Sequence, residues 1–369
     1  MMLLYARRLL QRQALRLSLT IIAVALCAVM MQFLLATYRG VADGSVDYVR
    51  ANECDLWVVQ RNSTNMLRGT SFLTAERGDS IARRAHVRSA SPVLLLLPNI
   101  RTAAGQATIF LAGYDPSQSV GGPPEIVEGR TISSDSDIVL DKAFARKLGI
   151  SIGDVVTIND SALTVTGIST GTNAFVIQYG FVTLERARRV AGIPNLVSMY
   201  LITVDSGADV SDVKHDIESS VAGVAVFDHD RFLANNLNEM ESGFLPLLYA
   251  IAGIGLVVMT VVLSLLLSIT ILERRRDFAI MKTLGAPSGY LPASIALQSA
   301  MTALLGLTVA AIVYPALIAL IETVSPAINT TTTVSQVALV AGACTLVSQV
   351  SALLAMRRLR TIYAMEVFR

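Results

Sequence analysis

Four long apolar stretches without a charged side chain constrain this sequence more than any other feature. They cover residues 17–37, 242–272, 291–321 and 334–356. A helix of about 20 residues crosses the roughly 30 Å hydrocarbon core of a bilayer. Hydrophobic residues make up 53% of the chain and charged residues only 16%, which disfavours a soluble enzyme and a disordered chain. We therefore predict an α-helical membrane protein with four transmembrane helices.

Two of these stretches admit a second interpretation. The first follows several arginines, as in a cleaved signal peptide, but the apolar core of a signal peptide usually has about 7–15 residues. We therefore expect a retained helix preceded by residues 1–16. The third stretch extends upstream to Thr283 and is long enough for two helices. Because Pro287 and Gly289 interrupt its start, we expect one helix over 291–321.

The basic residues that flank the stretches predict the orientation, because Lys and Arg favour the cytoplasmic side. Residues 1–16, 273–290 and 357–369 are rich in Arg and Lys, and four crossings place all three on one side. Both termini are then cytoplasmic, and the short loop 322–333, which has no basic residue, lies outside. The segment 38–241 also lies outside; its 18 Lys/Arg and 24 Asp/Glu give it a negative charge, unlike the rest of the chain.

The outer segment 38–241 predicts an α+β domain of its own, because short β-rich runs alternate with helical ones and turn residues separate them. Asp209 and Ser211 are candidate N-caps of the last helix. The strands are expected at residues 56–60, 93–97, 107–112, 155–158, 163–168 and 199–204. The helices are expected at residues 74–84, 141–148, 184–191 and 209–221.

Catalytic and cofactor motifs are not visible in the sequence. There is no GxxxxGK[ST] phosphate loop, so the chain should not hydrolyse ATP itself, and there is no HExxH, GxSxG or GxGxxG. We expect no catalytic residue, no metal site, no cofactor and no nucleic-acid partner. The three histidines are far apart, and the run 228–230 fits a capping turn better than a cation site. The acidic pairs Asp135/Asp137 and Asp212/Asp216 are expected on solvated faces.

The charge-free apolar stretches also bear on transport. A proton- or ion-coupled transporter normally needs acidic, basic or histidine side chains at membrane depth, and no Asp, Glu, Lys, Arg or His occurs in these four stretches. Secondary transport is therefore disfavoured, and any transport must draw its energy from another protein. Small residues on the second stretch, Gly253, Gly255, Ser264 and Ser268, suit either contact with a second copy or ordinary packing within the chain.

A charged amphipathic segment follows the second apolar stretch. Phe278, Met281 and Leu284 recur at helical spacing and form an apolar stripe, and Gly285 is placed to end the helix. Such a helix lies at the membrane interface or docks into a groove of a partner. A basic loop that only anchors the neighbouring helix would have a similar composition.

A family resemblance emerges at this segment. The run ERRRDFAIMKTLGA closely resembles the signature of MacB/FtsX-type (type VII) ABC permeases, and the layout of one helix, a large outer domain and three further helices is similar. In the outer domain, the run GDVVTI with Gly153 and Asp154, followed by VTGI with Gly167 and Ile168, resembles the periplasmic core domain of that family. The run 54–60 is most similar to the DevC glycolipid-export and HrtB haem-efflux permeases.

The resemblance implies a non-catalytic permease in the bacterial inner membrane. Its partners would be a cytoplasmic ABC ATPase dimer, which binds ATP and Mg²⁺, a second copy or a related permease, membrane lipid and a periplasmic adaptor. Closure of the ATPase dimer would move the helices and the outer domain, a mechanism called mechanotransmission. The residues expected to couple to the ATPase are Glu273, Arg274, Arg275, Arg276, Asp277, Phe278, Met281, Lys282, Leu284 and Gly285.

The substrate would enter laterally between the first two helices near the outer leaflet. Methionine and aromatic side chains adapt to irregular apolar ligands, so a lipid, a haem or a hydrophobic drug would suit this place. Glu241 also fits a simpler role at the entry to a helix. Two alternatives remain: an FtsX-like transducer that switches an outer partner, and a receptor-like anchor without an ATPase. The expected lining residues are Met30, Phe33, Leu34, Tyr38, Met240, Glu241, Phe244 and Leu248.

Overall fold

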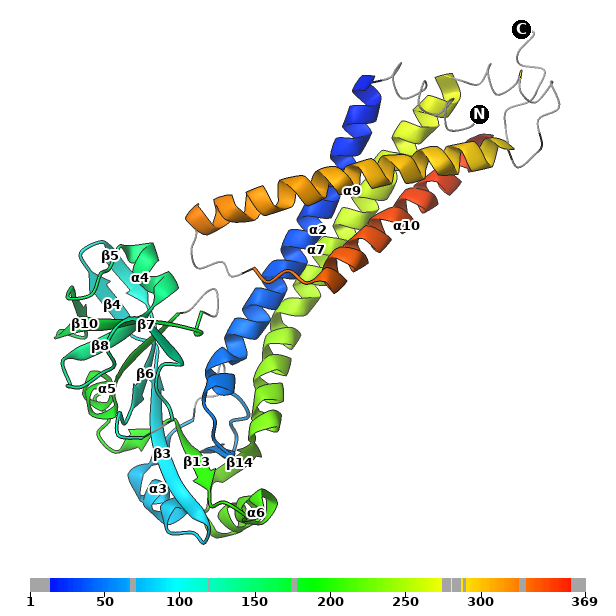
Figure 1. The fold of residues 1–369 in the computed structure, drawn as a ribbon. Coiled ribbons are helices and arrows are strands. Elements are labelled where there is room, and N and C mark those ends of the chain that lie inside the picture. Colours follow the sequence, from blue (N-terminus) through cyan, green and yellow to red (C-terminus); the bar gives the residue numbers. More distant parts are fainter. Residues whose placement is uncertain are drawn as a thin grey trace. The chain divides into compact units, whose positions relative to one another are not determined.

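A computed structural model describes residues 14–66, 71–118, 120–173, 178–273, 280, 287, 290–324 and 330–359. The chain divides into two compact units (Figure 1). The helical unit comprises Met1–Tyr38, Pro246–Leu320 and Thr330–Arg369, and the outer unit comprises Arg39–Leu245 and Ile321–Asn329. The division falls inside three long helices, near residues 38, 245 and 320, so each of these helices contributes residues to both units.

Four helices in the described part of the chain are long and apolar enough to cross a membrane. The third apolar stretch forms a single helix in which Pro315 is accommodated. The first two helices are longer than hydropathy predicts, because their polar extensions belong to the outer unit: α2 continues past residue 37, and α7 begins before residue 242. The four are α2 (Ala14–Ala51), α7 (His229–Glu273), α9 (Tyr290–Val324) and α10 (Val334–Leu359).

The outer unit is built on two split β-α-β units. Helix α3 connects β1 to β3 and helix α6 connects β13 to β14, and the strand order β14-β1-β13-β3 is antiparallel throughout. Asp209 caps α6 by accepting a hydrogen bond from the amide of Ser211, as expected for the first of the two candidate caps. The bounds are β1 (Leu56–Gln60), α3 (Ala75–Ala82), β3 (Val87–Leu96), β13 (Met199–Val204), α6 (Val210–Ser220) and β14 (Val224–Asp228).

Both faces of this four-stranded sheet are covered, which explains why β1 is almost continuously apolar. Leu56 and Val58 point to the face packed by α3 and α6. Trp57 and Val59 point to the opposite face, where they share a core with Tyr48 at the end of α2 and with residues at the start of α7. The outer ends of both long helices are therefore part of the core of the outer unit.

A second β-rich part is inserted between β3 and β13. It joins the first through β3, whose later residues pair with β6, so that the described strands form a single twelve-stranded sheet apart from the short β2–β12 pair. Its strands are β4 (Asn99–Thr102), β5 (Gly105–Thr108), β6 (Phe110–Tyr114), β7 (Glu125–Gly129), β8 (Asp137–Asp141), β9 (Val155–Ile158), β10 (Ser161–Thr170) and β11 (Tyr179–Thr183). Its helices are α4 (Lys142–Leu148) and α5 (Leu184–Ala191), and the short pair is β2 (Leu73–Thr74) with β12 (Leu196–Val197).

The structure confirms the predicted strands at 56–60, 155–158 and 199–204 and the helix at 184–191. The strand predicted at 107–112 is wrong, because the chain changes partners at Ile109: β5 pairs with β4, whereas β6 pairs with β3 and β11. Strand β3 begins at Val87, well before the predicted 93–97, and the other predicted elements shift by one or two residues at their ends. The prediction omitted β2, β4, β7, β8, β11, β12 and β14.

Candidate functional site

The core of the helical unit is made of apolar side chains from all four helices. Met31 of α2, Met259 of α7, Ala310 of α9 and Cys344 of α10 are buried in one cluster. A second buried apolar cluster is formed by side chains of α7, α9 and α10, namely Leu267, Ile271, Ile295, Ala352 and Ala355. Large side chains on the outward faces of the same helices are exposed, as in helices surrounded by lipid.

Two glycines bring helices close together in this unit. A Cβ on Gly306 of α9 would lie 2.6 Å from Val24 of α2, and a Cβ on Gly255 of α7 would lie 2.6 Å from the Met30 methyl group. A Cβ on Gly253 would meet nothing within 4 Å. Of the two roles considered for these small residues, Gly255 thus serves packing within the chain.

Polar side chains in the helical unit bond to neighbouring helices. The hydroxyls of Ser299 and Ser348 lie 2.6 Å apart, and each lies within 3.0 Å of the carbonyl oxygen of the other residue. Ser351 of α10 donates to the carbonyl of Thr260 on α7 at 3.2 Å, and Gln336 donates to that of Leu35 on α2. Hydrogen bonds between helices replace the bonds that these groups would make with water.

The residues predicted to couple to the ATPase lie outside the described residues, except Glu273. Glu273 is the last residue of α7 and is exposed. The coupling role therefore stays a prediction.

The predicted substrate residues are divided between the two units. Met30, Phe33, Leu34 and Tyr38 of α2 and Leu248 of α7 are half-buried in the helical unit. Met240 and Glu241 are half-buried in the outer unit, and the side chain of Phe244 lies outside the described part. Met30 lies against Gly255, and the grouping of these residues into one site stays a prediction.

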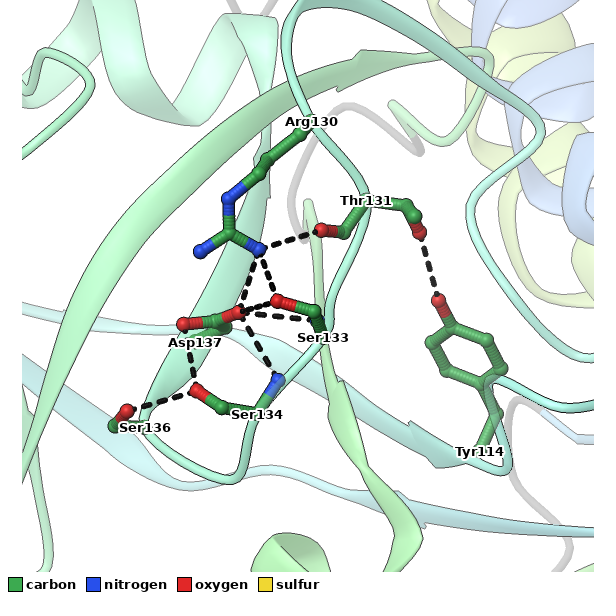
Figure 2. A network of polar contacts seen from close by, with 7 residues as sticks. All are labelled: Tyr114, Arg130, Thr131, Ser133, Ser134, Ser136 and Asp137. Carbon is green, nitrogen blue, oxygen red and sulfur yellow. Dashed lines mark hydrogen bonds and ion pairs between the residues drawn. The ribbon is translucent and has the colours of Figure 1, made fainter.

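Asp137 was expected on a solvated face, and this prediction is wrong because its side chain is buried. Its carboxylate accepts hydrogen bonds from the amides of Ser133 and Ser134 at 3.0 and 3.1 Å, from both hydroxyls, and from Arg130 at 2.8 Å (Figure 2). Burial opposes ionisation, but these hydrogen bonds outweigh it and hold the pKa of Asp137 well below its usual range. The network fixes the turn that leads into β8.

Asp135 also has a structural role. It accepts a hydrogen bond from Thr183 at 2.6 Å and pairs with Arg189, and so ties the turn before β8 to the start of α5. Asp212 is exposed, as expected.

The run 228–230 forms the capping turn that the sequence favours. Asp228 accepts a hydrogen bond from the amide of Arg231 at 2.8 Å, in the first turn of α7. Among the described residues, no three His, Cys, Asp or Glu side chains are grouped to hold a metal ion.

The glycines of the two outer-domain motifs have clear geometrical reasons. Gly153 has a φ of +93°, and its amide donates to Val165 at 2.8 Å, which places GDVVTI beside the following strand. A Cβ on Gly167 would lie 2.4 Å from the carbonyl oxygen of Arg130, and one on Gly129 would lie 2.3 Å from that of Thr166. The backbones of β7 and β10 therefore approach at a distance that only glycine allows.

Comparisons with known proteins match both halves of the chain. The model of the MacB-like periplasmic core domain matches residues 17–220, and that of the FtsX-like permease C-terminal region matches residues 249–364. An ABC transporter permease of Mycobacterium tuberculosis is 25% identical over 319 residues, 84% of each chain. One of Methanocaldococcus jannaschii is 26% identical over 168 residues, covering 42% of this chain and 41% of its own.

Among solved structures, the periplasmic region of MacB from Actinobacillus actinomycetemcomitans matches 49% of this chain and 92% of its own length, with a TM-score of 0.40 and 11% identity. The narrower resemblance to DevC and HrtB permeases stays a prediction. Because the periplasmic core model alone covers more than half of the chain and the relatives are ABC permeases, this protein belongs to the MacB/FtsX-type ABC transporter permeases.

Proposed function

We propose that this chain is the permease subunit of an ABC exporter that acts on a hydrophobic or amphiphilic substrate by mechanotransmission. An ABC permease works with a cytoplasmic ATPase in general, and the segment from Glu273 to Gly285 would bind it. Two copies, or two related permeases, would cross the bacterial inner membrane four times each, with their termini in the cytoplasm. Substrate would be extracted from the membrane or the outer compartment, with or without a periplasmic adaptor.

One observation in two parts carries this proposal. The four apolar stretches contain no Asp, Glu, Lys, Arg or His, and the helices α2 and α7 contribute residues to both units. The first part leaves no charged relay for ion coupling. The second part supplies continuous helices along which a displacement made at one end reaches the outer unit. Together, the two parts favour a mechanism in which helix movement acts on the substrate, and they disfavour a mechanism in which the substrate passes through a polar pore.

The test is Phe278→Asp in the full chain, reconstituted in lipid nanodiscs with its ATPase. A charge on the apolar stripe should abolish the stimulation of ATP hydrolysis by the permease, while insertion into the membrane stays unchanged. Thr283→Asp is the matched control, because on an ideal helix it lies about 160° from the centre of the stripe. Equal stimulation by Phe278→Asp and the wild type would refute the coupling role.

The same nanodiscs distinguish an exporter from a transducer. An exporter should show faster ATP hydrolysis when a lipid, haem or hydrophobic drug is added. If none of these changes the rate while Phe278→Asp still uncouples the ATPase, the FtsX-like transducer becomes the better description.

A further inference from the structure

Two buried asparagines lie at the ends of α2 and α7 that belong to the outer unit. Asn52 directly follows α2 and is 3% exposed, and Asn236 lies near the start of α7 and is fully buried. Each donates its amide N–H to the carbonyl four residues earlier, Asn52 to Tyr48 at 2.7 Å and Asn236 to Phe232 at 2.8 Å. Each also presents its Oδ1 to the backbone amide of a loop that is distant in sequence.

The residue four positions before each asparagine is a buried aromatic ring that packs on the sheet. Tyr48 stacks on Tyr179, with 5.2 Å between ring centroids, and Phe232 stacks on Trp57 at 4.7 Å. Both helices therefore combine a ring anchored in the core with an amide directed at a loop. We call the pair Tyr48/Asn52 the α2 clamp and the pair Phe232/Asn236 the α7 clamp.

The α2 clamp holds the loop between β6 and β7 at a single glycine. The amide of Gly121 donates to Asn52, and its carbonyl accepts a hydrogen bond from the Tyr48 hydroxyl at 2.8 Å. Gly121 has a φ of +94°, and a Cβ there would lie 2.9 Å from Val93. The loop therefore meets the helix through its backbone, which fixes its position more narrowly than an apolar contact would.

The α7 clamp holds a different loop, the one that follows β1. The amide of Met66 donates to Asn236 at 3.0 Å, and the Met66 side chain is buried in the same core as Trp57. One turn further along α7, Glu239 accepts a hydrogen bond from Asn65 at 3.5 Å. This loop belongs to the split β-α-β part, whereas the loop of Gly121 belongs to the inserted part.

We infer that the two clamps are the points at which α2 and α7 each move a separate loop of the outer unit. Asn52 and Asn236 are thus positioning residues: a displacement of α2 reaches the inserted part through Gly121, and one of α7 reaches the split β-α-β part through Met66. Apolar side chains can slide past one another, but a buried amide that loses its partner loop leaves unpaired polar groups, so loop and helix move together. This inference rests on the proposed function.

The experiment measures hydrogen–deuterium exchange in the full chain with its ATPase in nanodiscs, nucleotide-free and trapped with ATP by a hydrolysis-deficient ATPase. Asn52→Ala and Asn236→Ala are compared with Glu53→Ala and Asn238→Ala, which alter exposed neighbours on the same segments. In the wild type and both controls, ATP should change exchange in both loops. Without nucleotide, each clamp variant should exchange about tenfold faster in its own loop only.

The response to ATP tests the inference itself. In Asn52→Ala, ATP should no longer change the exchange of the loop of Gly121 but should still change that of the loop of Met66. In Asn236→Ala, ATP should still change the exchange of the loop of Gly121 but no longer that of the loop of Met66. The inference is overturned if both loops keep their responses in both variants, or if either variant loses both. If an alanine variant does not fold, Tyr48→Phe or Asn236→Ser replaces it, with the same expected division.

Measurements on the wild type alone distinguish a failure of the clamp inference from a failure of the proposed function. If ATP changes exchange in α2 and α7 but in neither loop, the clamps are refuted while the proposed function stands. If the chain neither binds the ATPase nor alters ATP hydrolysis, the proposed function fails and the role of the clamps fails with it.

Discussion

Replacing Asp137 tests whether a buried carboxylate stabilises the outer unit. Asp137→Ala leaves the amides of Ser133 and Ser134 without their acceptor, and each such loss costs about 1–3 kcal/mol. The Arg130 side chain is 55% exposed, so its ion pair adds at most about 1 kcal/mol. The turn lies close to solvent, which offsets part of the loss, so we expect a destabilisation of about 3 kcal/mol. Asp137→Asn keeps one acceptor oxygen and should cost about 1 kcal/mol.

Trp57 provides the assay, because it is the only tryptophan in the chain and is buried in the outer unit. Trp57 and Val139, which follows Asp137 on β8, belong to one hydrophobic cluster, so the fluorescence of Trp57 should follow the unfolding caused at Asp137. For a unit of this size, about 3 kcal/mol corresponds to a fall in Tm of roughly 6–12 °C. Asp212→Ala, at an exposed position, is the control and should leave Tm unchanged.

The destabilisation caused by Asp137→Ala should depend on pH in a definite direction. The folded-state pKa of Asp137 lies below its unfolded value, so the carboxylate contributes its full stability above the unfolded pKa and loses it as pH falls towards the folded value. The difference in Tm between the wild type and Asp137→Ala should be constant from about pH 5 to 8 and should shrink below about pH 4. The reasoning is refuted if Asp137→Ala melts with the control at pH 7, or if the difference grows as pH falls.

Three further predictions concern single positions. Gly306→Ala forces a Cβ against Val24 and should destabilise the helical unit by about 1–3 kcal/mol in a denaturant titration, whereas Gly253→Ala should be neutral; equal effects would contradict the packing. Burial raises the pKa of the Cys54 thiol, so this thiol should react with a maleimide at pH 8 only after unfolding, and rapid labelling of Cys54 itself in the native chain, located by peptide mapping, would disprove its burial. Asp228→Ala removes the cap of α7 and should lower the free energy of unfolding by about 1 kcal/mol, measured by thermal unfolding followed through Trp57 fluorescence. An unchanged Tm would show that the cap contributes nothing.

The helices and the buried strands were predictable because both follow from hydrophobic patterning. The stretch at 291–321 has no charge and forms a single helix, and the apolar run at 56–60 forms β1 with both faces covered. Patterning does not show where a helix stops being lipid-facing. Residues 38–51 contain several charges, and α2 nevertheless continues through them because Val46, Tyr48 and Val49 are buried in the outer unit.

The polar networks were not predictable, because the partners of a buried polar group come from chain geometry and not from composition. Asp137 lies in a run of serines and aspartates that is typical of a solvated loop, and only the direction of the Ser133 and Ser134 amides makes it a buried acceptor. Serine and aspartate are typical turn residues, so the run 133–137 does indicate a turn, but nothing in it shows which carboxylate is buried.

The clamp asparagines show the same principle at long range. An aromatic residue four positions before an asparagine is too common a spacing to be informative, and the two loops lie 69 and 170 residues from the asparagines that bind them. Apolar burial alone would hold α2 and α7 against the sheet at many slightly different positions, since such contacts have little direction. A buried amide tolerates only the position at which its donor and acceptor are both satisfied. The outer ends of the two helices are therefore held by the core but aligned by their asparagines, and a helix that transmits displacement needs that alignment more than it needs additional apolar area.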